Sequence, residues 1–358
     1  MHRIRVLVVE DSLTARKRIV EVLESDPAFE VLAETGDGKT AIELCHQLRP
    51  DLVTLDMVLP VMSGLAAAEY IMAYCPTPIL IVSSSTNRGE MFRTYDALAA
   101  GAVDILEKPD GHEPEGVWER ALLAKARVVS QIKVITHLRS RLRGSPGLAA
   151  LSTPSAPRRP SAEPYRVVAI GTSTGGPAAC VEILRNLPPG FPLPILLVIH
   201  IGPAFGQFLA EWLDSQSDFS VGYAQDGAVL SRIAPGHVLM APPDRHLVVR
   251  DGRMRLTHDP ERHSCRPSVD LLFESLAAAM GPQTIACLLT GMGKDGARGL
   301  LALRQAGART LAQDRATSAV FGMPQEAIRL GAADDVLPLD QFPPALVALA
   351  ARMDRPAA

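Results

Sequence analysis

Three acidic residues and a lysine in the first third of the chain stand where short aliphatic segments end. Glu10 and Asp11 follow the first segment, Asp56 follows the third, and Lys108 follows the fifth. Carboxylates that converge on one point repel each other, so this set predicts a bound hard cation such as Mg²⁺. A carboxylate beside Mg²⁺ can accept a phosphoryl group, because the metal and the lysine neutralise the charge on the transferred oxygens.

Ser83 ends the fourth aliphatic segment and is placed to hydrogen-bond a phosphate on Asp56. Taken singly, each residue has a plainer interpretation, since an Asp at a strand end is usually a loop residue or a helix cap. An acid pair, an Asp, a Ser and a Lys-Pro pair on successive strand ends form a much more specific pattern. We therefore predict a phospho-acceptor site with Asp56 as the acceptor.

A second set of reactive residue types lies in the last part of the chain. Ser173 stands in the glycine-rich stretch 171–177, His200 follows the aliphatic run 194–199, and Asp295 lies in a tight turn after a third run. Together they can form a hydrolytic triad. Ser173 Oγ would attack, His200 would take and return its proton, and Asp295 would orient the imidazole. Backbone N–H groups at Gly293 and its neighbours could form an oxyanion hole.

Each member of this second set also has a structural interpretation. A glycine-rich turn often only connects two elements, a histidine at a strand end is often structural, and Asp is a preferred helix N-cap. The stretch 171–177 fits neither the dinucleotide-binding nor the Walker pattern. The triad hypothesis is favoured because three parallel strands would deliver Ser173, His200 and Asp295 to one sheet edge.

The aliphatic segments alternate with helical stretches, which predicts a parallel α/β fold in both parts of the chain. The first part repeats βα five times, and the last part is expected to be a doubly wound, mostly parallel α/β domain. Ligands of such sheets bind at the carboxyl ends of the strands. The first five strands are expected at 4–9, 30–33, 52–55, 78–82 and 103–106.

The length of 358 residues suggests two domains. Residues 117–142 are rich in helix formers with apolar residues at helical spacing, and a Pro/Ser-rich tract follows that cannot pack. We therefore expect a first domain at 1–125, a helical and then Pro/Ser-rich flexible linker at 126–163, and a second domain at 164–350.

Charge divides the chain in the same places. Residues 1–118 carry 10 basic and 19 acidic side chains, residues 119–163 carry 9 and 2, and residues 164–358 carry 17 and 18. A near-neutral last block argues against a nucleic-acid-binding output domain. The basic middle block could bind an anion, but a solvated linker helix is the favoured interpretation.

Other features of the composition exclude further classes of protein. No apolar run is long enough for a membrane span, and the N-terminus lacks a signal-peptide pattern, so we expect a cytoplasmic protein without membrane insertion. The five cysteines form no CxxC pair, which predicts reduced thiols rather than disulfides or zinc. The histidines at 237, 246, 258 and 263 lack metal-ligand spacing and are expected at the surface or in packing.

Residues 1–125 resemble a response-regulator receiver domain, both in the strand-end residues above and in the stretch 56–64, DMVLPVMSG. The resemblance implies that Asp56 takes phosphate from a histidine kinase and that Glu10, Asp11 and Asp56 hold Mg²⁺. Ser83 and Lys108 would be the switch residues. Position 105 is Ile, where many receivers carry an aromatic switch residue.

The last part is similar to the catalytic domain of the chemotaxis protein-glutamate methylesterases. The motifs that carry the resemblance are 171–176, 198–200, 241–246, 266–273, 291–296 and 313–324. It implies Ser173 as nucleophile, His200 as base and Asp295 as orienting acid. The N–H of Met292 would serve the oxyanion, and Thr174 would line the site. No cofactor is expected in this domain.

The two resemblances imply a phosphorylation-activated hydrolase that acts on glutamyl methyl esters in the cytoplasmic helices of chemoreceptors and deamidates receptor glutamines. The expected partners are those receptors and a histidine kinase, and not nucleic acid. Three alternatives remain: a non-catalytic adaptor, a DNA-binding regulator and a serine peptidase. The intact triad argues against the adaptor, and the near-neutral, strand-rich last domain argues against DNA binding.

Overall fold

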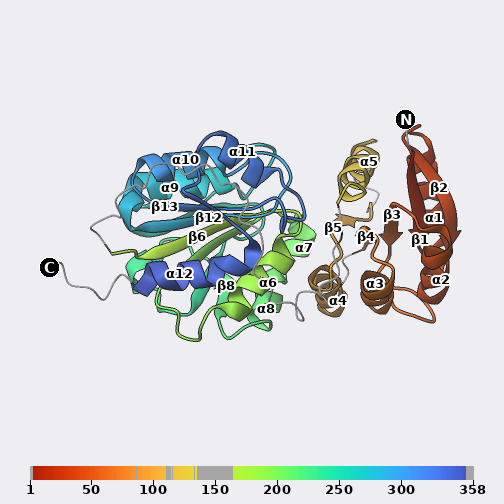
Figure 1. The fold of residues 1–358 in the computed structure, drawn as a ribbon, viewed down its shortest axis with the longest axis horizontal. Coiled ribbons are helices and arrows are strands. Elements are labelled where there is room, and N and C mark those ends of the chain that lie inside the picture. The colour runs from red at the N-terminus through yellow and green to blue at the C-terminus, as the bar shows by residue number, and fades with distance from the viewer. Residues whose placement is uncertain are drawn as a thin grey trace. The chain divides into compact units, whose positions relative to one another are not determined.

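The fold is described from a computed structural model of the chain (Figure 1). The described residues are 3–84, 87–109, 114, 116–132, 134 and 164–351. They belong to two compact units, divided between residues 148 and 149. Of the predicted linker 126–163, residue 133 and residues 135–163 lie outside the described part. Among the described helices, none has the length and apolar character that crossing a membrane requires.

The described part of residues 3–134 forms a parallel sheet of five strands in the order β2-β1-β3-β4-β5, which confirms the predicted fold. The strands are β1 (Ile4–Val9), β2 (Phe29–Thr35), β3 (Leu52–Leu55), β4 (Ile79–Ser83) and β5 (Asp104–Glu107). The helices are α1 (Leu13–Glu24), α2 (Gly38–Leu48), α3 (Gly64–Tyr74), α4 (Arg88–Ala99) and α5 (Val117–Val129). All residues of β3 and β4 are buried, which explains their mostly aliphatic sequence.

Helix α5 ends within the helical stretch predicted at 117–142, of which residues 133 and 135–142 lie outside the described part. It ends at Val129, where the N–H of Ser130 bonds to the carbonyls of Ala126 and Val128. Ala126 and Val129 are fully buried in a core shared with α1 and the sheet. The last turn of α5 therefore lies beyond the predicted boundary at residue 125 and packs into the first unit, because its apolar side chains are covered there.

The described part of the second unit has a parallel sheet of seven strands, in the order β14-β13-β12-β6-β7-β9-β8, and a separate antiparallel pair β10-β11. The strands are β6 (Val167–Thr172), β7 (Ile195–Ile199), β8 (Ser220–Tyr223), β9 (His237–Met240), β10 (His246–Arg250), β11 (Arg253–Thr257), β12 (Thr284–Leu288), β13 (Arg309–Gln313) and β14 (Asp335–Leu337).

Helices cover this second sheet. They are α6 (Gly176–Asn186), α7 (Pro203–Gly206), α8 (Leu209–Asp214), α9 (Val269–Met280), α10 (Ala297–Gln305), α11 (Met323–Arg329) and α12 (Phe342–Ala350), with 3-10 turns η2 (Leu230–Arg232), η3 (Gly281–Gln283) and η4 (Leu339–Gln341). From central β6 the chain builds outward through β7 on one side, and it later returns to β12 on the other. Ligands of doubly wound sheets bind at such a reversal of strand order.

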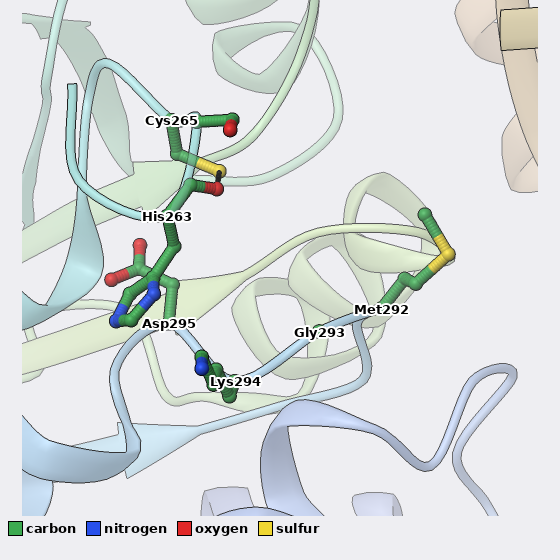
Figure 2. A pocket seen from close by; sticks show the side chains of 7 residues that line it. His263, Cys265, Met292, Gly293, Lys294 and Asp295 are labelled. Atoms are coloured by element: carbon green, nitrogen blue, oxygen red, sulfur yellow. Dashed lines mark hydrogen bonds between the residues drawn. The ribbon is translucent and has the colours of Figure 1, made fainter. Parts of the chain in front are cut away.

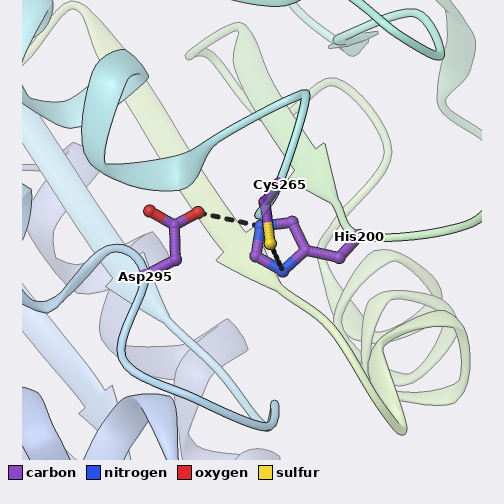
Figure 3. Close-up of side chains that lie close together, drawn as sticks. All are labelled: His200, Cys265 and Asp295. Atoms are coloured by element: carbon purple, nitrogen blue, oxygen red, sulfur yellow. Dashed lines mark hydrogen bonds and ion pairs between the residues drawn. The ribbon is translucent and has the colours of Figure 1, made fainter. Parts of the chain in front are cut away.

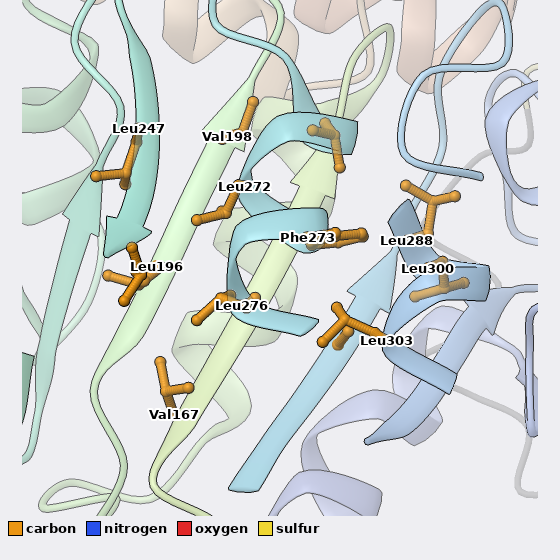
Figure 4. Close-up of a cluster of buried hydrophobic side chains, with 14 of the residues drawn as sticks. Val167, Leu196, Val198, Leu247, Leu272, Phe273, Leu276, Leu288, Leu300 and Leu303 are labelled. Atoms are coloured by element: carbon orange, nitrogen blue, oxygen red, sulfur yellow. The ribbon is translucent and has the colours of Figure 1, made fainter. Parts of the chain in front are cut away.

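Helix α9 holds the second unit's core together. Its Leu272, Phe273 and Leu276 are fully buried against residues of β6, β7 and β12, such as Val167 and Leu196 (Figure 4). Burial of one such side chain contributes about 1.5–3 kcal/mol to the free energy of unfolding. The N-terminus of α9 is thereby fixed over the carboxyl ends of the central strands.

Gly171 permits the close approach of α9 to β6. A Cβ at this position would lie 2.1 Å from Cγ1 of Val269, which is fully buried. We expect Gly171→Ala to lower the free energy of unfolding by about 1–3 kcal/mol, measured by urea denaturation, because the packed helix cannot move away. The matched control is Gly222→Ala in β8, where a Cβ would meet no atom within 4 Å. Equal losses in the two variants would contradict this packing argument.

Candidate active site

The sheet register brings the ends of three strands together in the second unit. Thr172 at the end of β6 pairs with Ile199 at the end of β7, so Ser173 and His200 follow on adjacent strands. The N–H of His200 donates to the carbonyl of Thr172 at 3.1 Å. Strand β12 lies on the other side of β6 and leads into the turn that holds Asp295. The three predicted residues therefore share one sheet edge.

His200 and Asp295 are in direct contact. Nε2 of His200 lies 2.8 Å from Oδ2 of Asp295, whose side chain is 2% exposed (Figure 3). The N-terminus of α9 also holds this carboxylate, through Ser268 Oγ at 2.8 Å and the N–H groups of Val269 at 2.7 Å and Asp270 at 3.1 Å. Burial alone would raise the pKa of Asp295, but the hydrogen bonds from His200, Ser268 and Val269 outweigh it and lower the pKa.

The second ring nitrogen of His200 faces a cysteine. Nδ1 lies 3.6 Å from Sγ of Cys265, while Nε2 contacts Asp295 (Figure 3). Burial would lower the pKa of His200, but the hydrogen bonds with Asp295 and Cys265 outweigh it and raise the pKa to about 9. The imidazole is therefore a stronger base than a free histidine side chain.

Ser173 lies against the turn that follows β12. The N–H of Ser173 donates to the carbonyl of Thr290 at 3.0 Å. A Cβ placed on Gly291 would lie 2.8 Å from the Cβ of Ser173. Its Oγ makes no hydrogen bond to any of the described residues. The structure thus joins His200 to Asp295 and places Ser173 at the neighbouring strand end, while its role as nucleophile stays a prediction.

The turn after β12 presents backbone donors beside Ser173. The N–H groups of Met292 and Gly293 donate no hydrogen bond within the described residues. The N–H of Gly291, in contrast, donates to the carbonyl of Val320, and the carbonyl of Gly291 accepts from the N–H groups of Gly322 and Met323. Met292 is 45% exposed. Thr174 is buried, and its carbonyl accepts a hydrogen bond from Thr290 Oγ1 at 2.9 Å. This arrangement suits the predicted oxyanion site at Met292.

A pocket of about 370 Å³ opens at this turn. Figure 2 shows His263, Cys265, Met292, Lys294 and Asp295 around it. Seven residues line it in all: His263, Ser264, Cys265, Met292, Gly293, Lys294 and Asp295. The pocket therefore opens beside Asp295 and the predicted oxyanion donors, while Ser173 and His200 are not among its lining residues.

Sequence reasoning missed two residues of this pocket. Cys265 and His263 lie in the loop before α9, and no spacing or periodicity in that loop signals a site. Nε2 of His263 lies 3.2 Å from Oδ2 of the buried Asp270. His246, in contrast, packs as predicted: it is fully buried, and its Nδ1 accepts the N–H of Ser268 at 3.1 Å. All five cysteines are free thiols.

The first unit brings its predicted residues together at the carboxyl ends of β1, β3 and β5. Nζ of Lys108 lies 2.8 Å from Oδ2 of Asp56 and 2.9 Å from Oε1 of Glu10. Ser83 Oγ donates to Oδ1 of Asp56 at 3.2 Å. Burial disfavours the charged form of Lys108, but the hydrogen bonds to Asp56 and Glu10 outweigh it and raise its pKa.

The same acidic residues fit a hard cation. Oε2 of Glu10 is buried and accepts no hydrogen bond, although Lys108 lies nearby. Glu10, Asp11 and Asp56 each offer an oxygen within 4.8 Å of the others. Burial raises the pKa of Glu10 above its ordinary value despite the hydrogen bond from Lys108. A divalent cation bound here would stabilise the ionised carboxylates.

Comparison with known proteins identifies relatives of both units. Residues 168–346 match the family model described as CheB methylesterase, and residues 6–114 match that of the response regulator receiver domain. A protein-glutamate methylesterase/protein-glutamine glutaminase of Nitrosospira multiformis is 42% identical over 352 residues, which cover 97% of each chain. A relative of the same description in Anaeromyxobacter dehalogenans is 44% identical over 343 residues, or 96% of each chain.

Two solved structures from Thermotoga maritima are similar to parts of this chain. The CheB methylesterase catalytic domain is 40% identical, covering 52% of this chain and 98% of its own, with a TM-score of 0.49. The response regulator domain of CheB is 35% identical, covering 37% of this chain and 99% of its own, with a TM-score of 0.33.

Proposed function

The chain belongs to the protein-glutamate methylesterase/protein-glutamine glutaminase family, and on that premise we propose that Ser173, His200 and Asp295 hydrolyse glutamyl methyl esters of chemoreceptors under the control of Asp56. The observation that carries this proposal is the His200–Asp295 contact of 2.8 Å at the sheet edge shared with Ser173. A base oriented by a buried carboxylate, one strand away from a serine, is the arrangement that acyl transfer needs.

The contacts of His200 support a specific order of proton transfers. Because Asp295 occupies Nε2, the nitrogen left for Ser173 is Nδ1, and Cys265 must move away from it during the reaction. Ser173 Oγ attacks the ester carbonyl while Nδ1 takes its proton, and the N–H groups of Met292 and Gly293 stabilise the oxyanion. The imidazolium returns the proton to the leaving methoxide, so methanol departs. Water then hydrolyses the acyl-enzyme by the same transfers and yields glutamate.

Glutamine deamidation uses the same groups. Attack on an amide carbonyl forms a corresponding tetrahedral intermediate, and the imidazolium of His200 protonates the amide nitrogen, which leaves as ammonia. The carboxylate of Asp295 stays ionised and stabilises the imidazolium in both reactions.

Control of the hydrolase is assigned to the first unit. Glu10, Asp11 and Asp56 would hold Mg²⁺, which supplies charge neutralisation during phosphoryl transfer from a histidine kinase. Asp56 takes the phosphoryl group, and Lys108 pairs with its oxygens. Ser83 exchanges its present hydrogen bond with Asp56 for one to the phosphate. These new contacts bias the unit between two conformations with different effects on the hydrolase.

Mass spectrometry of a receptor cytoplasmic fragment tests this function against its alternatives. The fragment carries both glutamyl methyl esters and glutamines, and it is incubated with the phosphorylated chain. We expect the esters to lose one methylene in mass, with no cleavage of the peptide chain. Intact esters and intact peptide bonds would instead support the non-catalytic adaptor, and shortened fragments would support a peptidase.

Ester hydrolysis is expected to rise with pH between 7 and 9. The base must be neutral to accept the proton of Ser173, and the pKa of His200 is raised to about 9, so kcat/KM should increase up to about tenfold per pH unit below that value. Cys265→Ala removes one contact that raises the pKa of His200, so kcat/KM of this variant should rise at lower pH than kcat/KM of the native chain. A profile that is flat from pH 7 to 9 would contradict the assignment of His200.

A further inference from the structure

We propose that Cys265 and His200 form a binding site for a thiophilic divalent cation such as Zn²⁺, and that the bound cation inhibits the hydrolase. Sγ of Cys265, a ring nitrogen of His200 and a carboxylate oxygen of Asp295 lie within 4.8 Å of each other, and Sγ lies 3.6 Å from Nδ1. The binding part of the proposal stands on this geometry alone. The inhibition rests on the proposed function.

The distance between the two ligand atoms suits a tetrahedral metal. With Zn–S near 2.3 Å and Zn–N near 2.0–2.1 Å, tetrahedral coordination separates sulfur and nitrogen by about 3.5–3.6 Å. The observed separation of Cys265 Sγ and His200 Nδ1 is 3.6 Å. A cation can therefore bridge these two atoms without a change in their separation, and binding releases the thiol proton.

A carboxylate already holds His200, as in many histidine-metal sites. When Nε2–H donates to Oδ2 of Asp295, the neutral ring has its lone pair on Nδ1, the nitrogen that lies 3.6 Å from Sγ of Cys265. Ser268 and Val269 fix Asp295 in turn through their own hydrogen bonds. A carboxylate behind the ligating histidine sets the tautomer and raises the basicity of the nitrogen that faces the metal.

The pocket leaves room for the remaining ligands. Cys265 and Asp295 both line it, so water can fill the open coordination positions (Figure 2). Lys294 also lines the pocket, and its charge opposes a cation. The buried carboxylates of Asp270 and Asp295 offset that charge, and both belong to a second cluster of possible ligands with His263.

A cation at the proposed site would bind the ring nitrogen that the reaction needs. Nδ1 of His200 is the nitrogen that receives the proton of Ser173, because Nε2 is occupied by Asp295. A cation on Nδ1 holds the same lone pair, so Ser173 cannot be deprotonated. Removal of the cation by a chelator frees the nitrogen again.

Cobalt binding to the full chain tests the site without reference to activity. Co²⁺ coordinated by a thiolate gives a sulfur-to-metal charge-transfer absorption that carboxylate ligands do not give. Co²⁺ at the acidic site of the first unit would therefore not contribute to this absorption, and excess Mg²⁺ is added to occupy that site. We expect this absorption in the native chain and in Cys180→Ser, whose thiol is fully buried elsewhere. We expect none in Cys265→Ser or Cys265→Ala, and Asp295→Asn should weaken binding about 10- to 100-fold.

Zn²⁺ inhibition of ester hydrolysis tests the second part, with each variant compared to its own metal-free rate. Zn²⁺ should abolish hydrolysis by the native chain, a chelator should restore it, and Cys265→Ser should resist. Absence of the cobalt–thiolate absorption, or its persistence in both Cys265 variants, overturns the site. If the absorption depends on Cys265 but Zn²⁺ leaves hydrolysis unchanged, the inhibition is overturned. A chain with no hydrolase activity at all would overturn the proposed function and leave the cobalt result to decide the site.

Discussion

Replacement of Ser173 by alanine is expected to lower the rate of ester hydrolysis by about 10⁶-fold, the size of effect that loss of a serine nucleophile has in triad hydrolases. The variant retains the backbone contact between Ser173 and Thr290 and loses only the hydroxyl. No acyl-enzyme can then form at this position. The measurement is methanol release from a methylated receptor fragment.

Comparison of single and double variants of the triad makes this test more specific. Because the triad acts as a unit, His200→Ala added to Ser173→Ala should cost little more, while Asp295→Asn alone should cost about 10⁴-fold. Phosphoryl uptake by Asp56 is the control for folding of the rest of the chain. A loss of less than about 100-fold in Ser173→Ala would show that another group attacks the ester, and Cys265, beside His200, would be the first to examine.

Asp56→Asn is expected to abolish phosphoryl uptake and with it all stimulation of the hydrolase by a phosphodonor. An amide cannot form the acyl phosphate, and the exchange removes the charge that Lys108 contacts at 2.8 Å. Couplings between sites in one protein are commonly worth 5- to 150-fold, so stimulation of about that size should vanish. The measurement is the ratio of methanol release with and without phosphodonor.

The matched control for this variant is Asp51→Asn. Asp51 precedes β3, at the opposite edge of the sheet from Asp56, and accepts a hydrogen bond from the N–H of Arg5 at 2.9 Å. The Asp51→Asn variant should keep both phosphoryl uptake and the stimulation of methanol release by the phosphodonor. Stimulation that survives in Asp56→Asn would place the phosphorylation site at another residue.

The sequence predicted the positions of the chemical groups well wherever strand ends carried them. Buried strands are mostly aliphatic, and all parallel strands present their carboxyl ends at one edge, so the amino-acid pattern alone predicts that Asp56 and Lys108 lie together. Their contact of 2.8 Å agrees with that expectation. The contact between His200 and Asp295 follows from the same reasoning in the second sheet.

Loops and helix ends could not be predicted in the same way. Cys265 reaches His200 because the path of the loop before α9 brings it there, and neither periodicity nor spacing specifies such a path. The end of α5 at Val129 depends on which apolar side chains the sheet covers, whereas the helix-forming sequence continues. The choice of Nε2 as the nitrogen bound to Asp295 is equally a property of the assembled site.

The central claim is that phosphorylation of Asp56 controls hydrolysis at Ser173. It is tested most directly by methanol release from a methylated receptor fragment, with and without a phosphodonor and Mg²⁺. The account predicts release that rises with phosphodonor in the native chain, does not rise in Asp56→Asn and is lost in Ser173→Ala. Absence of release by a native chain whose Asp56 accepts phosphate, or release at the same rate by Ser173→Ala, would contradict it.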